Sequence, residues 1–184
     1  NLKYLQWLNL YGNWLTSIPQ SLTKLTSLVL VDLAVNRLTS LPNSLGELIN
    51  LKHLRLSRNQ LTSLPESLDR TNLLSLDVQH NRLTSLPESL GTSPTLRQLL
   101  VLGNQLSFLP ESFSNLKGLQ DLYLTQNNFT SLPPWIGNLV NLQILKLGSN
   151  KLSSLPDTLC NLKGLLHLSM ENNQLTALPN DLGQ

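Results

Sequence analysis

The stretch from Leu51 to Leu68 reads LKHLRLSRNQLTSLPESL, and its pattern of leucines, one asparagine and one proline decides the fold. The pattern occurs eight times, with its asparagine at Asn13, Asn36, Asn59, Asn81, Asn104, Asn127, Asn150 and Asn173. Successive asparagines are 23, 23, 22, 23, 23, 23 and 23 residues apart. Because a fixed period of this size is typical of stacked repeats, we predict a single domain of eight repeats over residues 1–184.

Each repeat begins with a short strand. Leu54 and Leu56 alternate with His53 and Arg55, which places the two sets on opposite faces of an extended segment. Pro65 then prevents a regular helix or central strand from continuing. One such unit cannot bury its own leucines, but parallel stacking lets each repeat cover its neighbour.

The recurring asparagine lies between apolar residues, so we expect all eight of these side chains to be buried. A buried amide needs partners for its donors and its acceptor. We therefore predict a ladder of asparagine side chains bonded to the backbone after each strand. Loss of one member should cost about 1–3 kcal/mol.

The pattern LxxLxLxxNxLxxLPxxL, seen in LKHLRLSRNQLTSLPESL and again in LQILKLGSNKLSSLPDTL, resembles the leucine-rich repeat. Its 23-residue form with Leu-Pro is similar to intracellular Ras-associated scaffold, Scribble-like, plant Ras-group and bacterial proteins. The resemblance implies an α/β-type solenoid, a horseshoe with a concave parallel sheet of about eight short strands and irregular or short helical convex segments. It also implies a scaffold or signalling role through protein binding.

Composition excludes several other classes. The net charge of +2 is too small to indicate nucleic acid, and Asp32 and Asp77 interrupt the basic positions. No apolar run is long enough to span a membrane. Cys160 is the only cysteine, so no internal disulfide forms, and the cysteine-rich caps of extracellular family members are missing. These features favour a reducing, cytoplasmic location.

No group of residues indicates an enzyme, a metal site or a cofactor. His53 and His167 occupy the same repeat position but are five strands apart, about 24 Å at sheet spacing. Cys160 belongs to a return segment, away from the strand that carries His167, so no Cys–His pair is expected. The glycines form no phosphate-binding loop.

We predict that the concave face binds a protein partner with an acidic patch. Its strand-side variable positions hold eight Lys/Arg against four acids, and Asp32, Arg55 and Asp77 should form one charged row. An aromatic and aliphatic centre with a charged rim is a common interface design. The candidate partner-binding residues are Trp7, Tyr11, Leu30, Arg55, Arg58, His80, Arg82, Leu100 and Tyr123.

Several alternatives stay open. Trp7 and Tyr11 are either a binding hot spot or the contact surface for a preceding repeat. Trp135, in LPPWIG, either anchors a partner on the convex edge or packs against a neighbouring turn. The whole domain is alternatively a substrate-recruiting region of a larger signalling enzyme or ubiquitin ligase, or an extracellular receptor or defence ectodomain. A glycan on Asn128, which begins an Asn-Phe-Thr sequon, would favour the ectodomain.

Two irregularities carry structural expectations. The leucine found twelve residues after most of the asparagines is replaced near Thr71 and Ser93, where the spacing also drops to 22. We expect local tightening there, because a lost buried leucine costs about 2–5 kcal/mol unless the backbone collapses. Neither end carries a polar capping unit, so the chain is expected to be a segment of a longer protein.

Overall fold

The computed structural model describes residues 2–182. Its strands are β1 (Trp7–Asn9), β2 (Leu30–Asp32), β3 (His53–Arg55), β4 (Ser75–Asp77), β5 (Gln98–Leu100), β6 (Asp121–Tyr123), β7 (Ile144–Lys146) and β8 (His167–Ser169). Short 3₁₀ helices follow the first seven strands: η1 (Gln20–Lys24), η2 (Asn43–Glu47), η3 (Glu66–Arg70), η4 (Glu88–Thr92), η5 (Glu111–Asn115), η6 (Pro134–Asn138) and η7 (Asp157–Asn161). A proline precedes each of these helices at its N-cap, where it removes no helical hydrogen bond.

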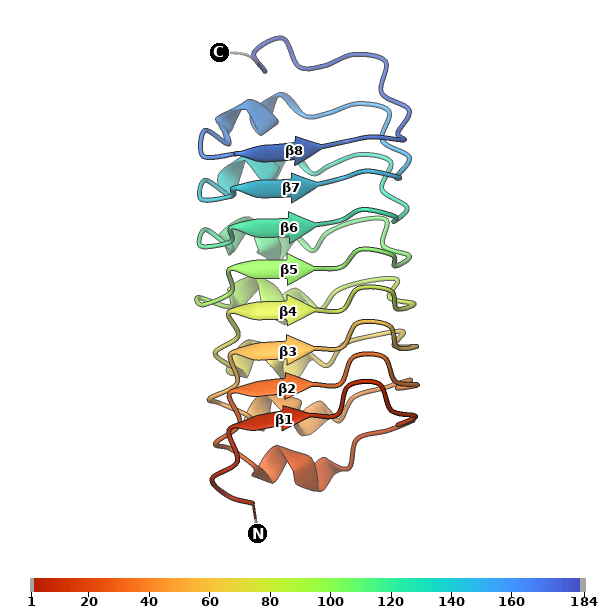
Figure 1. Ribbon diagram of the computed structural model, residues 1–184. Helices are drawn as coiled ribbons and strands as arrows, with labels where there is room; N and C mark the ends of the chain where they lie inside the picture. The colour runs from red at the N-terminus through yellow and green to blue at the C-terminus, as the bar shows by residue number, and fades with distance from the viewer. Residues whose placement is uncertain (1, 183–184) are drawn as a thin grey trace.

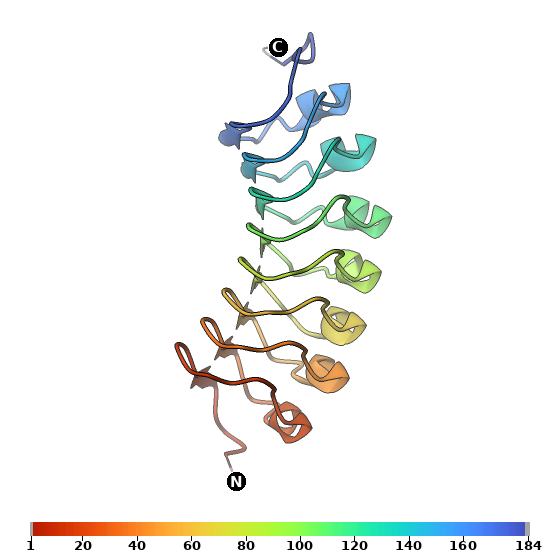
Figure 2. The same ribbon diagram turned by 90° about the vertical axis from the view of Figure 1, so that its right-hand side faces the viewer.

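The eight strands form one parallel sheet in sequence order, β1 to β8 (Figure 1). The register advances by one repeat at each step, so that Leu54 of β3 lies beside Val31 of β2 and Leu76 of β4. Seen from the side, the strands line the inner side of a shallow arc and the 3₁₀ helices line the outer side (Figure 2). The predicted α/β-type solenoid is therefore confirmed.

Leucine fills the space between the sheet and the helices. Leu54, Leu56, Leu61 and their equivalents in neighbouring repeats are fully buried in one continuous core. Phe113 and Phe129 take leucine positions and are buried as completely. Burial of each such side chain is worth roughly 1.5–3 kcal/mol, which is why the array depends on stacking.

The asparagine ladder has the predicted contacts. In Asn59, the Nδ2 amide donates to the carbonyls of Leu33 and Leu56 at 3.0 and 2.9 Å. Its Oδ1 accepts from the Leu38 amide at 2.9 Å. Each amide therefore bonds to its own turn and to the preceding repeat, and satisfies backbone groups that the leucine core would otherwise leave without partners.

The prediction that all eight asparagines are buried is wrong at the ends of the array. Six are buried, namely Asn36, Asn59, Asn81, Asn104, Asn127 and Asn150. Asn173 is half-buried but keeps the inter-repeat bond to Leu147. Asn13 is exposed and bonds only to Leu10 and Tyr11 of its own turn, because no described repeat covers it.

A left-handed residue precedes every asparagine of the ladder. These residues are Gly12, Val35, Arg58, His80, Gly103, Gln126, Ser149 and Asn172, with φ between 52° and 70°. This conformation turns the chain so that the following asparagine side chain points inward. The leucine pattern does not specify it, since only two of the eight positions are glycine.

The backbone has a different conformation at the irregular repeats, whereas the expected local tightening stays a prediction. The leucines that end the other helices have ψ between 53° and 64°, whereas Thr71 has 164° and Ser93 has 118°. Thr71 is buried, and its hydroxyl donates to the Leu68 carbonyl at 2.6 Å. A polar side chain thus replaces a core leucine without an unsatisfied hydroxyl.

The convex side carries a second set of contacts between repeats. The Glu66 carboxylate accepts from the Ser89 amide at 3.1 Å, and Glu88 accepts from Ser112 at 3.3 Å. Between η5 and η6, Trp135 makes the corresponding contact. Its Nε1 donates to Glu111 Oε2 at 2.8 Å, and the residue is only 8% exposed. Trp135 therefore packs within the array, and the structure disfavours it as an anchor for a partner.

Candidate protein-binding surface

Two rows of side chains cross the open face of the sheet. The first row consists of Trp7, Leu30, His53, Ser75, Gln98, Asp121, Ile144 and His167. The second row consists of Asn9, Asp32, Arg55, Asp77, Leu100, Tyr123, Lys146 and Ser169. The strand residues between the rows point into the core, so these two rows are the surface that a ligand would meet.

An aromatic group lies at the first repeat. Trp7 is 74% exposed and pairs in register with Leu30, which extends the apolar surface to β2 as predicted. Tyr11 is 60% exposed beyond the end of β1. Trp14, the third aromatic residue of this group, makes a cation–π contact with Arg37, whose guanidinium lies 4.4 Å from the Trp14 ring centroid.

The predicted charged row exists, and its centre is partly neutralised. Asp32, Arg55 and Asp77 are adjacent in the second row. Arg55 Nη1 lies 3.3 Å from Asp32 Oδ2, the only ion pair within residues 2–182. Asp32 is buried and also accepts the Ala34 amide at 3.0 Å. Arg55 therefore offers less net charge to a partner than its sequence position suggests.

Arg58, His80 and Arg82 lie beyond the strand ends and form what we call the basic edge. Arg58 and His80 occupy the same left-handed position in adjacent repeats. Their amides continue the sheet pairing to the Gln79 and Leu102 carbonyls at 2.8 and 2.7 Å, so their Cα atoms are about one strand spacing, 4.8 Å, apart. The basic edge has no ion pair to a carboxylate among the described residues.

The His80 ring lies against a glycine of the next repeat, Gly103. A Cβ on Gly103 would lie 2.5 Å from His80 Nδ1, so the ring leans over this residue of the next repeat. The contact places the His80 ring toward the fifth repeat, on the side away from Arg58. The sequence offers one sign of this contact: Gly103 occupies, in the fifth repeat, the same position that His80 occupies in the fourth.

A second apolar pair, Leu100 and Tyr123, is adjacent in the second row and half-buried. The neighbouring first-row residues form a chain of hydrogen bonds instead. Ser75 Oγ donates to Gln98 Oε1 at 2.7 Å, and Gln98 Nε2 donates to Asp121 Oδ2 at 2.9 Å. The sequence indicates this chain only in that its three members share one repeat position.

The candidate residues on the strands thus share one face but do not form one patch. The apolar pairs Trp7–Leu30 and Leu100–Tyr123 are separate, with Arg55 between them, and Tyr11 and the basic edge lie beyond the strand ends.

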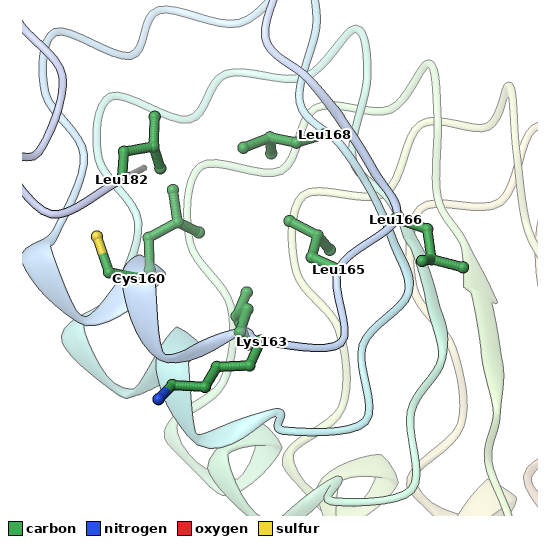
Figure 3. Close-up of a pocket in the computed structure, with 8 residues that line it drawn as sticks. Cys160, Lys163, Leu165, Leu166, Leu168 and Leu182 are labelled. Atoms are coloured by element: carbon green, nitrogen blue, oxygen red, sulfur yellow. The ribbon is translucent and has the colours of Figure 1, made fainter. Parts of the chain in front are cut away.

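Cavities lie at both end faces of the described array. One of about 410 Å³ lies beside the last repeat (Figure 3) and is lined by Leu159, Cys160, Leu162, Lys163, Leu165, Leu166, Leu168 and Leu182. Another of about 460 Å³ lies beside the first repeat, among Leu5, Leu8, Leu10, Leu15 and neighbouring residues. Both are end faces of the leucine core, where a repeat is covered on one side only.

Other kinds of site have no support in residues 2–182. This part of the chain has no group of three or more His, Cys, Asp or Glu side chains that could hold a metal ion. No helix there is both long enough and apolar enough to cross a membrane.

Comparisons with known proteins agree with this architecture. The sequence pattern of the family described as Leucine Rich Repeat matches residues 4–25, 50–70, 72–93, 118–139 and 141–162, together more than half of the chain. A search of curated proteins finds no match.

Similar solved structures include a leucine-rich repeat protein of Leptospira interrogans, with 37% identity and a TM-score of 0.96. A plant peptide hormone receptor in complex with its peptide RGF2 has 29% identity and a TM-score of 0.79. An octameric complex of Latrophilin 3, Unc5D and the leucine-rich repeats of FLRT2 has 29% identity and a TM-score of 0.84.

The alignments cover 99%, 96% and 98% of this chain but only 47%, 29% and 57% of those chains, so the chain spans a part of each of them. The family match and the fold lead to one conclusion: this chain belongs to the leucine-rich repeat family.

Proposed function

We propose that the chain is a non-enzymatic protein-interaction module that binds a protein partner on the concave sheet. The observation that carries the proposal is the presence of two apolar pairs, the exposed Trp7 with the half-buried Leu30 and the half-buried Leu100 with Tyr123, on a sheet whose repeats are bonded together by the asparagine ladder. Aromatic and leucine side chains on a preorganised surface supply binding energy at little entropic cost.

Charge supports a partner with an acidic patch. Arg58, His80 and Arg82 form the basic edge without an ion pair inside residues 2–182. A partner carboxylate would meet these groups without first displacing an internal ion pair. Such complementarity increases the association rate and selects against basic partners.

Similar structures also support the proposal, since a peptide hormone receptor and a multiprotein complex use the same fold. Catalysis has no candidate residues in this surface, and the expected cytoplasmic location stays a prediction.

The test is capture of the partner from the source organism with three baits. The first is the unchanged chain, and the second carries Arg58→Glu and Arg82→Glu on the basic edge. The third is a matched control with Lys24→Glu and Arg70→Glu, two exposed basic residues in η1 and η3 on the convex side. All three should show the same circular dichroism and melting temperature.

A partner that the first and third baits retain and the second loses supports the proposal. A partner that all three retain equally contradicts the role of the basic edge. In that case, Trp7→Ser and Leu100→Ser test the apolar pairs separately, and unchanged affinity for both would contradict binding on the concave sheet.

A receptor ectodomain is the second candidate, favoured by the similarity to the plant peptide hormone receptor. Asn128 is half-buried beside the buried Asn127, and Thr130 of its sequon is exposed. Mass spectrometry of the protein from its native source decides between the candidates: a glycan on Asn128 indicates secretion and supports the ectodomain.

A further inference from the structure

The two apolar pairs lie on different rows of the sheet. Trp7 and Leu30 belong to the first row, on β1 and β2, whereas Leu100 and Tyr123 belong to the second row, on β5 and β6. Polar groups occupy the other part of each row, and within each group the side chains bond to one another. These are the Asp32–Arg55 ion pair in the second row and the Ser75–Gln98–Asp121 chain in the first. A ligand that uses both apolar pairs must therefore cross the strands diagonally.

The register gives the length of this diagonal. Leu30 and Leu100 are three strands apart, about 14 Å, and one row apart, about 7 Å along the strand. The straight line between them is about 16 Å. An extended peptide advances about 3.3 Å per residue and alternates its side chains, so two side chains that reach both pairs from one face are four or six positions apart.

The middle of the diagonal crosses β3 and β4, where the surface is polar. His53 and Ser75 lie in the first row there, and Arg55 and Asp77 in the second. The Asp77 carboxylate accepts two hydrogen bonds within residues 2–182, and both use Oδ1, from the amide and the side chain of Gln79 at 3.1 Å. A ligand residue at this point has to be polar, because an apolar one would cover the Arg55 and Asp77 charges without replacing their water.

The charge around the middle is positive. The strand side of the second, third and fourth repeats holds five cations, Arg37, Lys52, Arg55, Arg58 and Arg82, and two carboxylates, Asp32 and Asp77, a net of +3 with histidine neutral. Arg58 follows Arg55 by three residues, about 10 Å at 3.3 Å per residue, which is comparable to the Debye length of about 8–10 Å in physiological salt. The surface therefore favours an acidic ligand residue at this point.

We propose that the partner presents an extended, acidic segment that crosses the sheet from Trp7–Leu30 to Leu100–Tyr123. Two apolar side chains, four or six positions apart, cover the two pairs, and one or more acidic residues between them face Arg55 and the basic edge. This inference rests on the proposed function and adds the conformation, spacing and charge of the segment.

An amphipathic helix fits this face less well. A helix would present an unbroken apolar stripe with contacts every three or four residues. Over 16 Å, that stripe would cover the Arg55 and Asp77 charges with apolar side chains. An extended segment alternates its side chains, so it places a polar residue at the middle and apolar residues only at the two ends.

The test selects 12-residue random peptides displayed on phage against the unchanged chain, with the selected peptides then synthesised and their dissociation constants measured. We expect them to share two large apolar residues, four or six positions apart, with Asp or Glu between them. Insertion of three glycines between the apolar residues should weaken binding at least tenfold. Leu30→Ser and Leu100→Ser should each do the same, while the control Val140→Ser, an exposed residue outside the strands, should change nothing.

Three results would overturn the inference: selected peptides with helical spacing of apolar residues, peptides with basic residues in the middle, or binding that ignores one of the two serine substitutions. The proposed function is tested separately by the native partner. If that partner still requires the basic edge or the apolar pairs, the function stands and only the extended segment is wrong. If the native partner and the peptides both ignore the concave substitutions, both proposals are wrong.

Discussion

Arg55 Nη1 lies 3.3 Å from Asp32 Oδ2 across β2 and β3, and the two side chains differ sharply in exposure. The Asp32 side chain is 9% exposed and the Arg55 side chain 54%. The buried carboxylate also accepts the Ala34 amide at 3.0 Å, so it supports the turn after β2 as well as its charged partner. The pair thus belongs partly to the fold and partly to the binding surface.

A double-mutant cycle of Asp32→Asn and Arg55→Gln should separate these roles. Because Arg55 is half exposed, we expect a coupling free energy of only about 0.2–1 kcal/mol in urea unfolding. Asp32→Ala should cost more, about 1–3 kcal/mol, since it also leaves the buried Ala34 amide without its acceptor. Equal costs for Asp32→Asn and Asp32→Ala would show that the amide contact is unimportant.

Position within the ladder should decide the cost of losing an asparagine. Asn81→Ala removes bonds to the Leu56 and Val78 carbonyls and to the Leu61 amide. We expect a loss of at least about 1–3 kcal/mol in the free energy of unfolding, the cost of one buried orphan group. Asn13→Ala is the matched control, because Asn13 is exposed and bonds only within its own turn. A comparable loss for both variants would mean that the bonds between repeats contribute little.

Of the eight left-handed residues that precede the ladder asparagines, Val35 is the least suited to this backbone conformation, because it is β-branched and has φ of 56°. Val35→Asn should stabilise the fold by about 0.5–1 kcal/mol, since asparagine tolerates this conformation and the amide bond to Ser57 at 2.8 Å is kept. Thermal unfolding measures the gain. Gln126→Asn, with the same φ of 56° but an unbranched side chain, should change stability less. A destabilised Val35→Asn protein would show that the half-buried valine side chain matters more than its backbone.

The two glycines among the eight left-handed residues should differ in their response to alanine substitution. Gly12 and Gly103 have φ of 70° and 68°, so alanine is strained at both by about 1 kcal/mol. Only at Gly103 would the new Cβ approach the His80 ring, whereas nothing lies within 4 Å at Gly12. Gly103→Ala should therefore be the more destabilising variant and should also shift the NMR signals of His80. Identical unfolding curves and an unmoved His80 signal would refute the contact.

Trp135 offers a test of the convex side. Trp135→Phe removes the hydrogen bond to Glu111 at 2.8 Å and should lower stability by about 1 kcal/mol. Partner affinity should stay unchanged, because the side chain is 8% exposed and packs between repeats. Calorimetric titration with the captured partner checks this, and a loss of affinity at unchanged stability would restore the convex-edge interpretation.

The sequence predicts the architecture because the repeat applies one physical rule eight times. Alternation at Leu54 and Leu56 determines which side chains enter the core, and the period determines which residues become neighbours on the sheet. The adjacency of Trp7 with Leu30, of Leu100 with Tyr123, and of Asp32 with Arg55 and Asp77 follows from that period alone. The amide bonds of the ladder follow as well, since a buried asparagine has few other ways to be satisfied.

Tertiary structure decides what depends on reach and rotamer rather than on spacing. Spacing shows that Arg55 lies between two acids, but only the packed turn after β2 makes Asp32 its partner and leaves Arg58, His80 and Arg82 unpaired with any described carboxylate. The burial of Trp135 depends on Glu111 of the preceding repeat, and the exposure of Asn13 on the lack of a described neighbour. Period and pattern therefore determine which backbone positions are adjacent, whereas side-chain contacts between repeats determine which charges and aromatic rings remain available to a partner.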